Sequence, residues 1–223
     1  MKKKNYSEKV ISIICLAILT VYFIAIIHIN FSKNPFYYNT DMYSDMIFAA
    51  EAWEHKSLFP EGWVFGNQLY IISTPALAAI IYGLLGDLCI SMGLASTVLG
   101  LGIVLSFDWM LKAFTEKLHE RLICITSFMT IVLLSGDLFL SANGFQLFFT
   151  MCSYYACYLI TAFLVFGCFL REIAGYPVNK IIFFISLIFS FACGIQSARQ
   201  TLVMTLPLVS LIFIRAKQLY SRK

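Results

Sequence analysis

The stretch VISIICLAILTVYFIAIIHI, residues 10–29, decides the fold class of this chain. It contains no Asp, Glu, Lys or Arg, and roughly 20 consecutive apolar residues are enough for a helix to cross the hydrocarbon core of a bilayer. The run is too long for the apolar region of a secretory signal, and no small-residue cleavage site follows it. We therefore expect a retained membrane span.

Further apolar runs follow along the rest of the chain. They cover residues 67–86, 92–111, 122–140, 146–169 and 179–196, with a shorter one at 201–214. Hydrophobic residues make up 60% of the chain and charged residues 13%, against about 25% charged in a soluble domain. The runs do not alternate as the strands of a membrane barrel do. The sequence predicts an all-α transmembrane bundle of about six or seven spans, as a single domain over residues 1–223.

The charges indicate a topology rather than a nucleic-acid partner. A net charge of +4 comes mainly from basic residues at the two ends and in short loops. The cluster Lys2, Lys3, Lys4 and Lys9 before the first span predicts a cytoplasmic N-terminus and an extracytoplasmic loop at 30–66. Simple alternation of seven spans then places the loop 112–121 and the basic tail outside, against the positive-inside rule. Either the number of spans is wrong by one, or the later loops break the rule.

Neither the cysteines nor the histidines indicate a metal site. All seven cysteines lie in or beside apolar runs, so we interpret them as buried small hydrophobic side chains. His28 and His55 have no partner at metal-ligand spacing, and we expect structural roles for both.

The loop 30–66 differs from the rest of the chain because it holds five of the twelve acidic residues and ten aromatic residues. Capping residues precede Asp41, and apolar side chains then recur at helical spacing over about 41–55. The apolar stripe consists of Met42, Met46, Ala49, Ala50 and Trp53. We predict an amphipathic helix lying on the membrane surface. Trp63 and Phe65 follow Pro60 and Gly62 and suit an interfacial aromatic belt.

Two aspartates in this helix form a candidate catalytic pair. Asp41 and Asp45 are four residues apart, which places their carboxylates on one helix face about 6 Å apart. Neighbouring carboxylates at a dielectric boundary resist joint ionisation, which suits one of them to act as a general base. The alternative is that both belong to the solvated face of an interfacial helix.

Three further ionisable residues lie near the ends of apolar runs. Asp137, near the end of the run 122–140, is either a group inside a functional cavity or a helix cap at the interface. Asp108 has the same two interpretations, with interface anchor preferred. Arg199 lies between the last two apolar runs and fits an ordinary loop residue, or a ligand for phosphate.

Several segments resemble a known family of membrane enzymes. The stretches Asp41-Met-Tyr-Ser-Asp45 and Pro60-Glu-Gly-Trp63-Val-Phe-Gly-Asn-Gln68-Leu-Tyr, with Pro75 after them, look like the first external loop of GT-C-fold glycosyltransferases of the dolichyl-phosphate-mannose and aminoarabinose transferase type. The later stretch Gly194-Ile-Gln-Ser-Ala-Arg199, followed by Leu206-Pro207-Leu208, is similar to another segment of such proteins.

This resemblance implies sugar transfer at the outer face of a cell membrane, from a polyprenyl-phosphate-linked sugar to an acceptor of the cell envelope. Asp41 or Asp45 would deprotonate or position the acceptor. Asp137, Arg199, Gln68 and Trp63 would line the substrate cavity, with Arg199 neutralising the lipid phosphate. Relatives often carry a Glu, sometimes a metal ligand, where this chain has Gln68, and the neutral amide is a poorer ligand for a divalent metal.

The resembling enzymes run past ten spans, whereas this chain has six or seven apolar runs. A partner subunit, or a missing C-terminal half, would reconcile the two. Two other functions stay open at this point. One is a transporter or flippase, and the other is a non-catalytic membrane partner.

Overall fold

The computed structural model describes residues 2–32, 40–66, 68–134, 148–150, 155–198 and 201–220. Within these ranges the chain is all-α, with eight α-helices and one π-helical turn, so the all-α part of the predicted fold class is confirmed. Three helices are long and apolar enough to cross a membrane: α1 (Lys2–Phe31), α4 (Leu88–Leu111) and α7 (Ala156–Ile173). They correspond to the predicted runs 10–29, 92–111 and 146–169.

Shorter apolar helices accompany these three. They are α5 (Leu118–Leu134), α8 (Lys180–Gln196) and α9 (Leu206–Tyr220), and a π-helical turn η2 (Thr201–Thr205) leads into α9. The end of the predicted run 122–140 lies outside the described residues, which stop at the end of α5 and resume at residue 148. The short run 201–214 corresponds to η2 and the first part of α9.

The predicted span 67–86 is wrong, because only its second half is helical. Helix α3 (Thr74–Leu85) has 12 residues and is about 18 Å long, against a hydrocarbon thickness of about 30 Å. The Ser73 hydroxyl caps it by accepting from the Ala76 amide at 3.3 Å, and Pro75 lies in its first turn. Gly86, with a φ of 70°, ends it in the left-handed conformation that glycine tolerates. Residues 68–73 before the cap are not helical.

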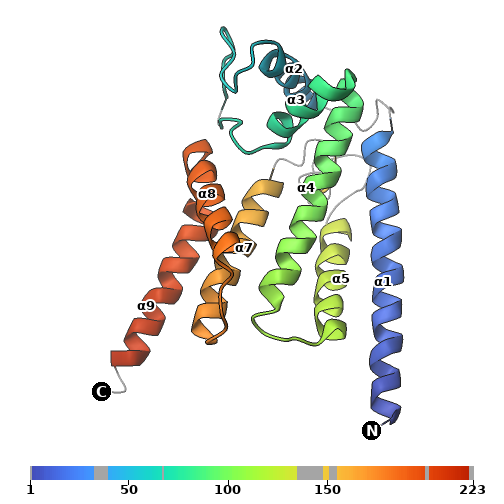
Figure 1. Ribbon diagram of the computed structural model, residues 1–223, viewed down its shortest axis with the longest axis vertical. Coiled ribbons are helices and arrows are strands. Elements are labelled where there is room, and N and C mark those ends of the chain that lie inside the picture. The colour runs from blue at the N-terminus through green and yellow to red at the C-terminus, as the bar shows by residue number, and fades with distance from the viewer. Residues whose placement is uncertain are drawn as a thin grey trace.

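Helix α4 lies at the centre of the bundle, with α7 on one side and α1 on the other, while α5 packs on α1 and α8 packs on α7 (Figure 1). Small residues permit these close approaches. A Cβ at Gly167 would collide with the ring of Trp109, and a Cβ at Gly93 would collide with the backbone carbonyl of Asn30. The bundle is therefore tight where α4 meets α7 and α1.

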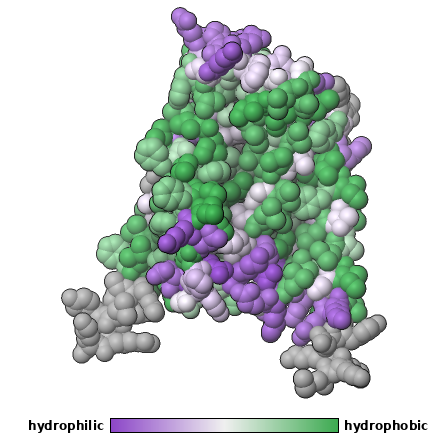
Figure 2. Space-filling model, in the orientation of Figure 1, coloured by the Kyte–Doolittle hydropathy of each residue, from purple (hydrophilic) through white to green (hydrophobic). Residues whose placement is uncertain are grey.

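The connections divide between two ends of the molecule. The start of α1, the α4–α5 connection, the α7–α8 connection and the end of α9 lie at the lower end in Figure 1, and α3 and α2 (Thr40–Glu54) lie at the upper end. Hydrophilic residues gather at these two ends, and hydrophobic residues cover the surface between them (Figure 2). This distribution fits a bilayer around the middle of the bundle.

Helix α2 occupies nearly the predicted range, but its buried face is rotated. Met42, Met46 and Ala49 are buried as expected, whereas Trp53 is 42% exposed. Asp45, Phe48 and Ala52 complete the buried face. The apolar stripe is thus directed at α3 and α4, on which α2 packs, so the helix is a packed element and does not lie with a free apolar face on a surface.

The cysteines follow the predicted pattern with one correction. Among the described residues, Cys15, Cys157, Cys168 and Cys193 are buried, and Cys89 is half-buried. Cys124 is instead exposed on α5. An apolar outer face explains this difference, because a small hydrophobic side chain on a membrane helix can face lipid as well as the core.

Candidate functional site

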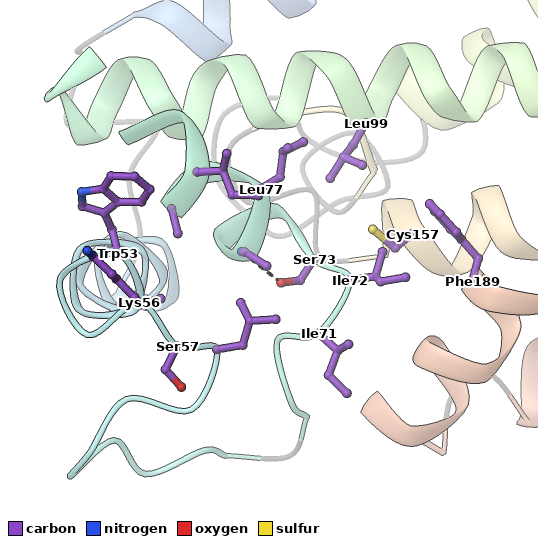
Figure 3. A pocket seen from close by; sticks show the side chains of 15 residues that line it. Trp53, Lys56, Ser57, Ile71, Ile72, Ser73, Leu77, Leu99, Cys157 and Phe189 are labelled. Carbon is purple, nitrogen blue, oxygen red and sulfur yellow. Dashed lines mark hydrogen bonds between the residues drawn. The ribbon is translucent and has the colours of Figure 1, made fainter. Parts of the chain in front are cut away.

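A groove of about 620 Å³ opens between the end of α2, helix α3 and the non-helical segment before α3 (Figure 3). Trp53 and Lys56 lie at one side of it, and Cys157 of α7 and Phe189 of α8 lie at the other. Its lining is otherwise formed by Ala52, Ser57, Leu58, Ile71, Ile72, Ser73, Ala76, Leu77, Ala79, Ile80 and Leu99. An apolar groove with few polar groups is the usual form of a site for an apolar ligand.

Among the described lining residues, Lys56 is the one that is charged. Within the described part of the chain, no carboxylate pairs with it. Its φ is 50°, the left-handed conformation in which glycine is the usual residue after a helix. The Lys56 amide donates to the Trp53 carbonyl at 3.2 Å, and the Ser57 amide donates to the Ala52 carbonyl at 3.0 Å. A lysine here costs roughly 1 kcal/mol of strain, and its cation is available at the groove rim.

An aromatic cluster supports the other side of α2. Phe48 is fully buried, and its ring meets Trp63 edge-on at 5.3 Å and Tyr70 at 4.6 Å between centroids. Phe65 joins the same cluster at 5.9 Å from Phe48. Trp63, which we expected in an interfacial belt or against substrate, is therefore a packing partner of Phe48 and is not among the groove residues.

A buried glutamine holds the floor of the groove in place. Gln196, 3% exposed at the end of α8, accepts with its Oε1 from the amides of Ile71 at 3.0 Å and Ile72 at 2.8 Å. Its Nε2 donates to the Tyr158 hydroxyl at 3.0 Å, and that hydroxyl donates to Gln68 Oε1 at 3.4 Å. The two backbone amides are thereby satisfied by a side chain, because the segment before α3 is not helical and a buried amide needs an acceptor.

Replacing Gln196 tests this support. Gln196→Met removes the acceptor of two amides at a buried position, and we expect a loss of stability on the order of 2 kcal/mol or more. Tyr158→Phe removes only the hydroxyl between Gln196 and Gln68, and its loss of stability should be smaller. Hydrogen exchange of the segment 68–73 should accelerate in Gln196→Met and change little in Tyr158→Phe. Equal exchange in wild type and Gln196→Met would show that the amides have another source of protection.

The two candidate aspartates have different environments. Asp41 is exposed in the first turn of α2, and Asp45 is 1% exposed on the face that packs on α3 and α4. The two carboxylates are therefore not both accessible, because the face of α2 that packs on α3 and α4 contains Asp45 as well as Met42 and Ala49. Neither residue lines the groove.

The remaining predicted site residues divide into two groups. Gln68 joins the Tyr158–Gln196 network beside the groove floor. Asp137 and Arg199 lie outside the described residues. Asp108, the less favoured candidate, is part of a charge network at the lower end, where Arg121 at 2.8 Å and Lys112 at 2.9 Å bind its carboxylate. This agrees with the preferred interpretation of Asp108 as an end anchor.

Lys56 and Tyr158 were missed by the sequence reasoning. Gln196 was named only as part of the stretch Gly194-Ile-Gln-Ser-Ala-Arg199. The sequence shows only that a polar amide side chain ends the apolar run 179–196. Its role depends on the backbone of residues 68–73, which approaches it in the fold and donates two hydrogen bonds to it. Lys56 carried no signal, since a lone lysine after a helix is normally a solvated end.

One acid–base pair lies next to the groove rim. His55 Nε2 is 3.3 Å from Glu51 Oε2 on α2, and both side chains are more than two-fifths exposed. Nothing in the described ranges forms a cluster of three metal-ligating side chains. A carboxylate-bound imidazole beside a lysine can accept a proton from an alcohol or orient a phosphate group.

Fold and site together define an all-α protein with three helices long and apolar enough to span a membrane, and with an apolar groove at one end of the bundle. Comparison with family models, with curated proteins and with solved structures finds no match to this chain.

Proposed function

We propose that this chain transfers a sugar from a polyprenyl-phosphate donor to an acceptor on the extracytoplasmic side of a membrane. The observation that carries the proposal is the apolar groove with Lys56 at its rim, the one cation among its described lining residues, next to the acidic helix α2. Such a groove fits an amphiphile with a long apolar chain and an anionic head. The resemblance of the 41–75 segment to the first external loop of GT-C glycosyltransferases points to the same ligand class.

The proposed orientation rests on a topology of six crossings. If the shorter helices α5, α8 and α9 cross the membrane together with the three long apolar helices α1, α4 and α7, all connections at the lower end of Figure 1 fall on the side of the N-terminus. That end carries Lys112, Lys117, Arg121 and Lys180. A hydrogen bond from Lys117 to Glu120 raises the pKa of Lys117 and keeps it cationic. In this proposed topology the conflict with the positive-inside rule disappears, and α2 and α3 would be extracytoplasmic.

Reporter fusions test this orientation. We expect a green fluorescent protein fused after residue 223 to fluoresce in a bacterial host, and alkaline phosphatase at the same point to be inactive. Seven spans would reverse both signals, so an active phosphatase fusion would contradict the six-span topology.

In the proposed reaction an acceptor hydroxyl attacks the anomeric carbon of the donor sugar. The bond between that carbon and the phosphate oxygen breaks, and the lipid phosphate leaves with the bonding electrons. A protein base takes the hydroxyl proton. Lys56 would neutralise the phosphate, which also makes it a better leaving group.

The position of the base depends on where the phosphate binds. Lys56 follows Asp41 by 15 residues, just beyond the end of α2, and at 1.5 Å per residue this is about 22 Å, so these two residues cannot serve one reacting bond. With the phosphate at Lys56, the nearest paired base is His55, oriented by Glu51. With the phosphate at the N-terminal end of α2, where the helix dipole favours an anion, the base is Asp41 and the buried Asp45 supports it.

Single substitutions separate the two arrangements. We would assay transfer of radiolabelled sugar from polyprenyl phosphate in native membranes containing wild type, Asp41→Asn, Asp45→Asn, His55→Gln or the exposed control Glu54→Gln. A loss of 10²-fold or more in His55→Gln alone assigns the base to the groove end, and the same loss in Asp41→Asn assigns it to the other end. Wild type without transfer, but co-purifying with a larger transferase, would sink the catalytic proposal in favour of the non-catalytic partner.

A lipid flippase is the second candidate, favoured by the non-helical segment 68–73 followed by the short helix α3. Broken helices at the ligand site are typical of transporters. Proteoliposomes distinguish the two functions, because a flippase moves a labelled polyprenyl-phosphate sugar between leaflets without cleaving it, whereas a transferase releases lipid phosphate.

A further inference from the structure

A second groove lies between α7, α8 and the η2–α9 segment, and nothing in the proposed sugar transfer uses it. Its volume is about 620 Å³. The upper lining is apolar or weakly polar and comes from all three helices: Val165, Phe169, Phe183, Leu187, Ser190, Met204 and Leu208. Along α8 the groove extends from Lys180 to Ser190, ten residues or about 15 Å of helix, which is about half the thickness of a bilayer core.

Two opposite charges lie at one end of this groove. Glu172, in the last turn of α7, and Lys180, the first residue of α8, both line it and both are exposed. No ion pair joins them within 4.0 Å, although they carry opposite charge and flank one opening. Both belong to the end of the bundle that holds the N-terminus, the α4–α5 connection and the end of α9 (Figure 1).

An amphiphile with two opposite head-group charges fits this arrangement. An acyl chain would lie along Phe169, Leu187 and Met204, and these apolar side chains would shield it from water. A phosphate would bind Lys180, and a primary ammonium, with three N–H donors, would bind Glu172. A trimethylammonium group has no N–H to donate, and an anionic head group would leave Glu172 facing like charge.

We infer that the α7–α8–α9 groove is a binding site for phosphatidylethanolamine in the leaflet next to the chain termini. The site is independent of the upper groove, because the two share no lining residue. Its occupant would pack η2 and α9 against α7 and α8. Among the elements that the structure describes, η2 packs on α9 and, less extensively, on α7, whereas the main contact of α9 is with η2.

Lipid titration of the purified full-length chain tests the inference. The probes are phosphatidylethanolamine, phosphatidylcholine and phosphatidylglycerol with identical acyl chains, each added to delipidated protein in detergent and followed by native mass spectrometry. We expect phosphatidylethanolamine to bind about tenfold more tightly than phosphatidylcholine, the difference that one charge-assisted hydrogen bond gives.

Variants assign the head-group contacts. Glu172→Gln should remove the preference for phosphatidylethanolamine over phosphatidylcholine, and Lys180→Gln should weaken all three phospholipids. The controls Glu116→Gln and Lys117→Gln, at the same end but outside the groove, should leave binding unchanged. Equal binding of the three lipids by wild type, a preference for phosphatidylglycerol, or equal effects of groove and control variants would overturn the inference.

Discussion

Lys56→Gly should abolish tight binding of a polyprenyl phosphate while leaving the protein as stable as wild type, or slightly more so. The loss of one charge-assisted contact to phosphate corresponds to roughly 1.5–3 kcal/mol, or a 10- to 100-fold weaker Kd. Stability should not fall, because the φ of 50° at this position suits glycine better than lysine. The substitution therefore separates the effect of the charge on binding from the effect of the backbone conformation on stability.

Calorimetric titration of detergent-purified wild type, Lys56→Gly and Lys56→Arg with a short-chain polyprenyl phosphate measures this effect. Lys56→Arg keeps the cation and should retain most of the affinity. A thermal melt of each variant serves as the folding control. Unchanged affinity in Lys56→Gly, with an unchanged melting temperature, would remove Lys56 from the site.

Gly93→Ala should destabilise the bundle by about 1–3 kcal/mol, the usual cost of forcing extra atoms into a tight interface. The added Cβ meets the backbone carbonyl of Asn30, which cannot turn aside as a side chain can. Asn30 is also fixed at that point, since its Nδ2 donates to Thr97 Oγ1 at 3.0 Å and to the Phe149 carbonyl at 3.1 Å. Helices α1 and α4 would have to separate at their upper ends.

Two other glycines provide matched controls for this prediction. A Cβ at Gly102, on the same helix, meets the flexible end of Ile160 at 2.9 Å, and we expect a smaller cost for Gly102→Ala. Gly194 on α8 has open space around it, so Gly194→Ala should be neutral or slightly stabilising. Thermal unfolding in detergent should rank the three variants in this order, and a neutral Gly93→Ala would show that α1 and α4 are not packed as described.

Long apolar runs predicted the fold class because 20 apolar residues have few alternatives to a membrane helix. The prediction of a span at 67–86 was wrong because hydropathy does not show where a helix begins and ends. Its first part is apolar, yet Ser73 and Pro75 are a helix start, and they stand in the middle of the run. Capping residues, given more weight than hydropathy, predict a shorter helix that begins after Ser73.

The site could be predicted only in part, for a similar physical reason. The position and extent of α2 followed from its capping and apolar residues, and Gln68 was among the candidates. The burial of Asp45 depends on a small rotation of the helix that packing on α3 and α4 decides. The groove itself joins Lys56 to Cys157 and Phe189 across more than a hundred residues of sequence, and local patterns do not report such contacts.

The most direct test of the central claim compares two ligands on the wild-type protein. A polyprenyl phosphate and the uncharged prenol of the same length are each titrated into the purified chain. The groove with Lys56 at its rim predicts saturable binding of both, with the phosphate bound at least tenfold more tightly. Equal affinities for the phosphate and the prenol would contradict the account, because the groove would then hold an apolar chain without recognising its head group.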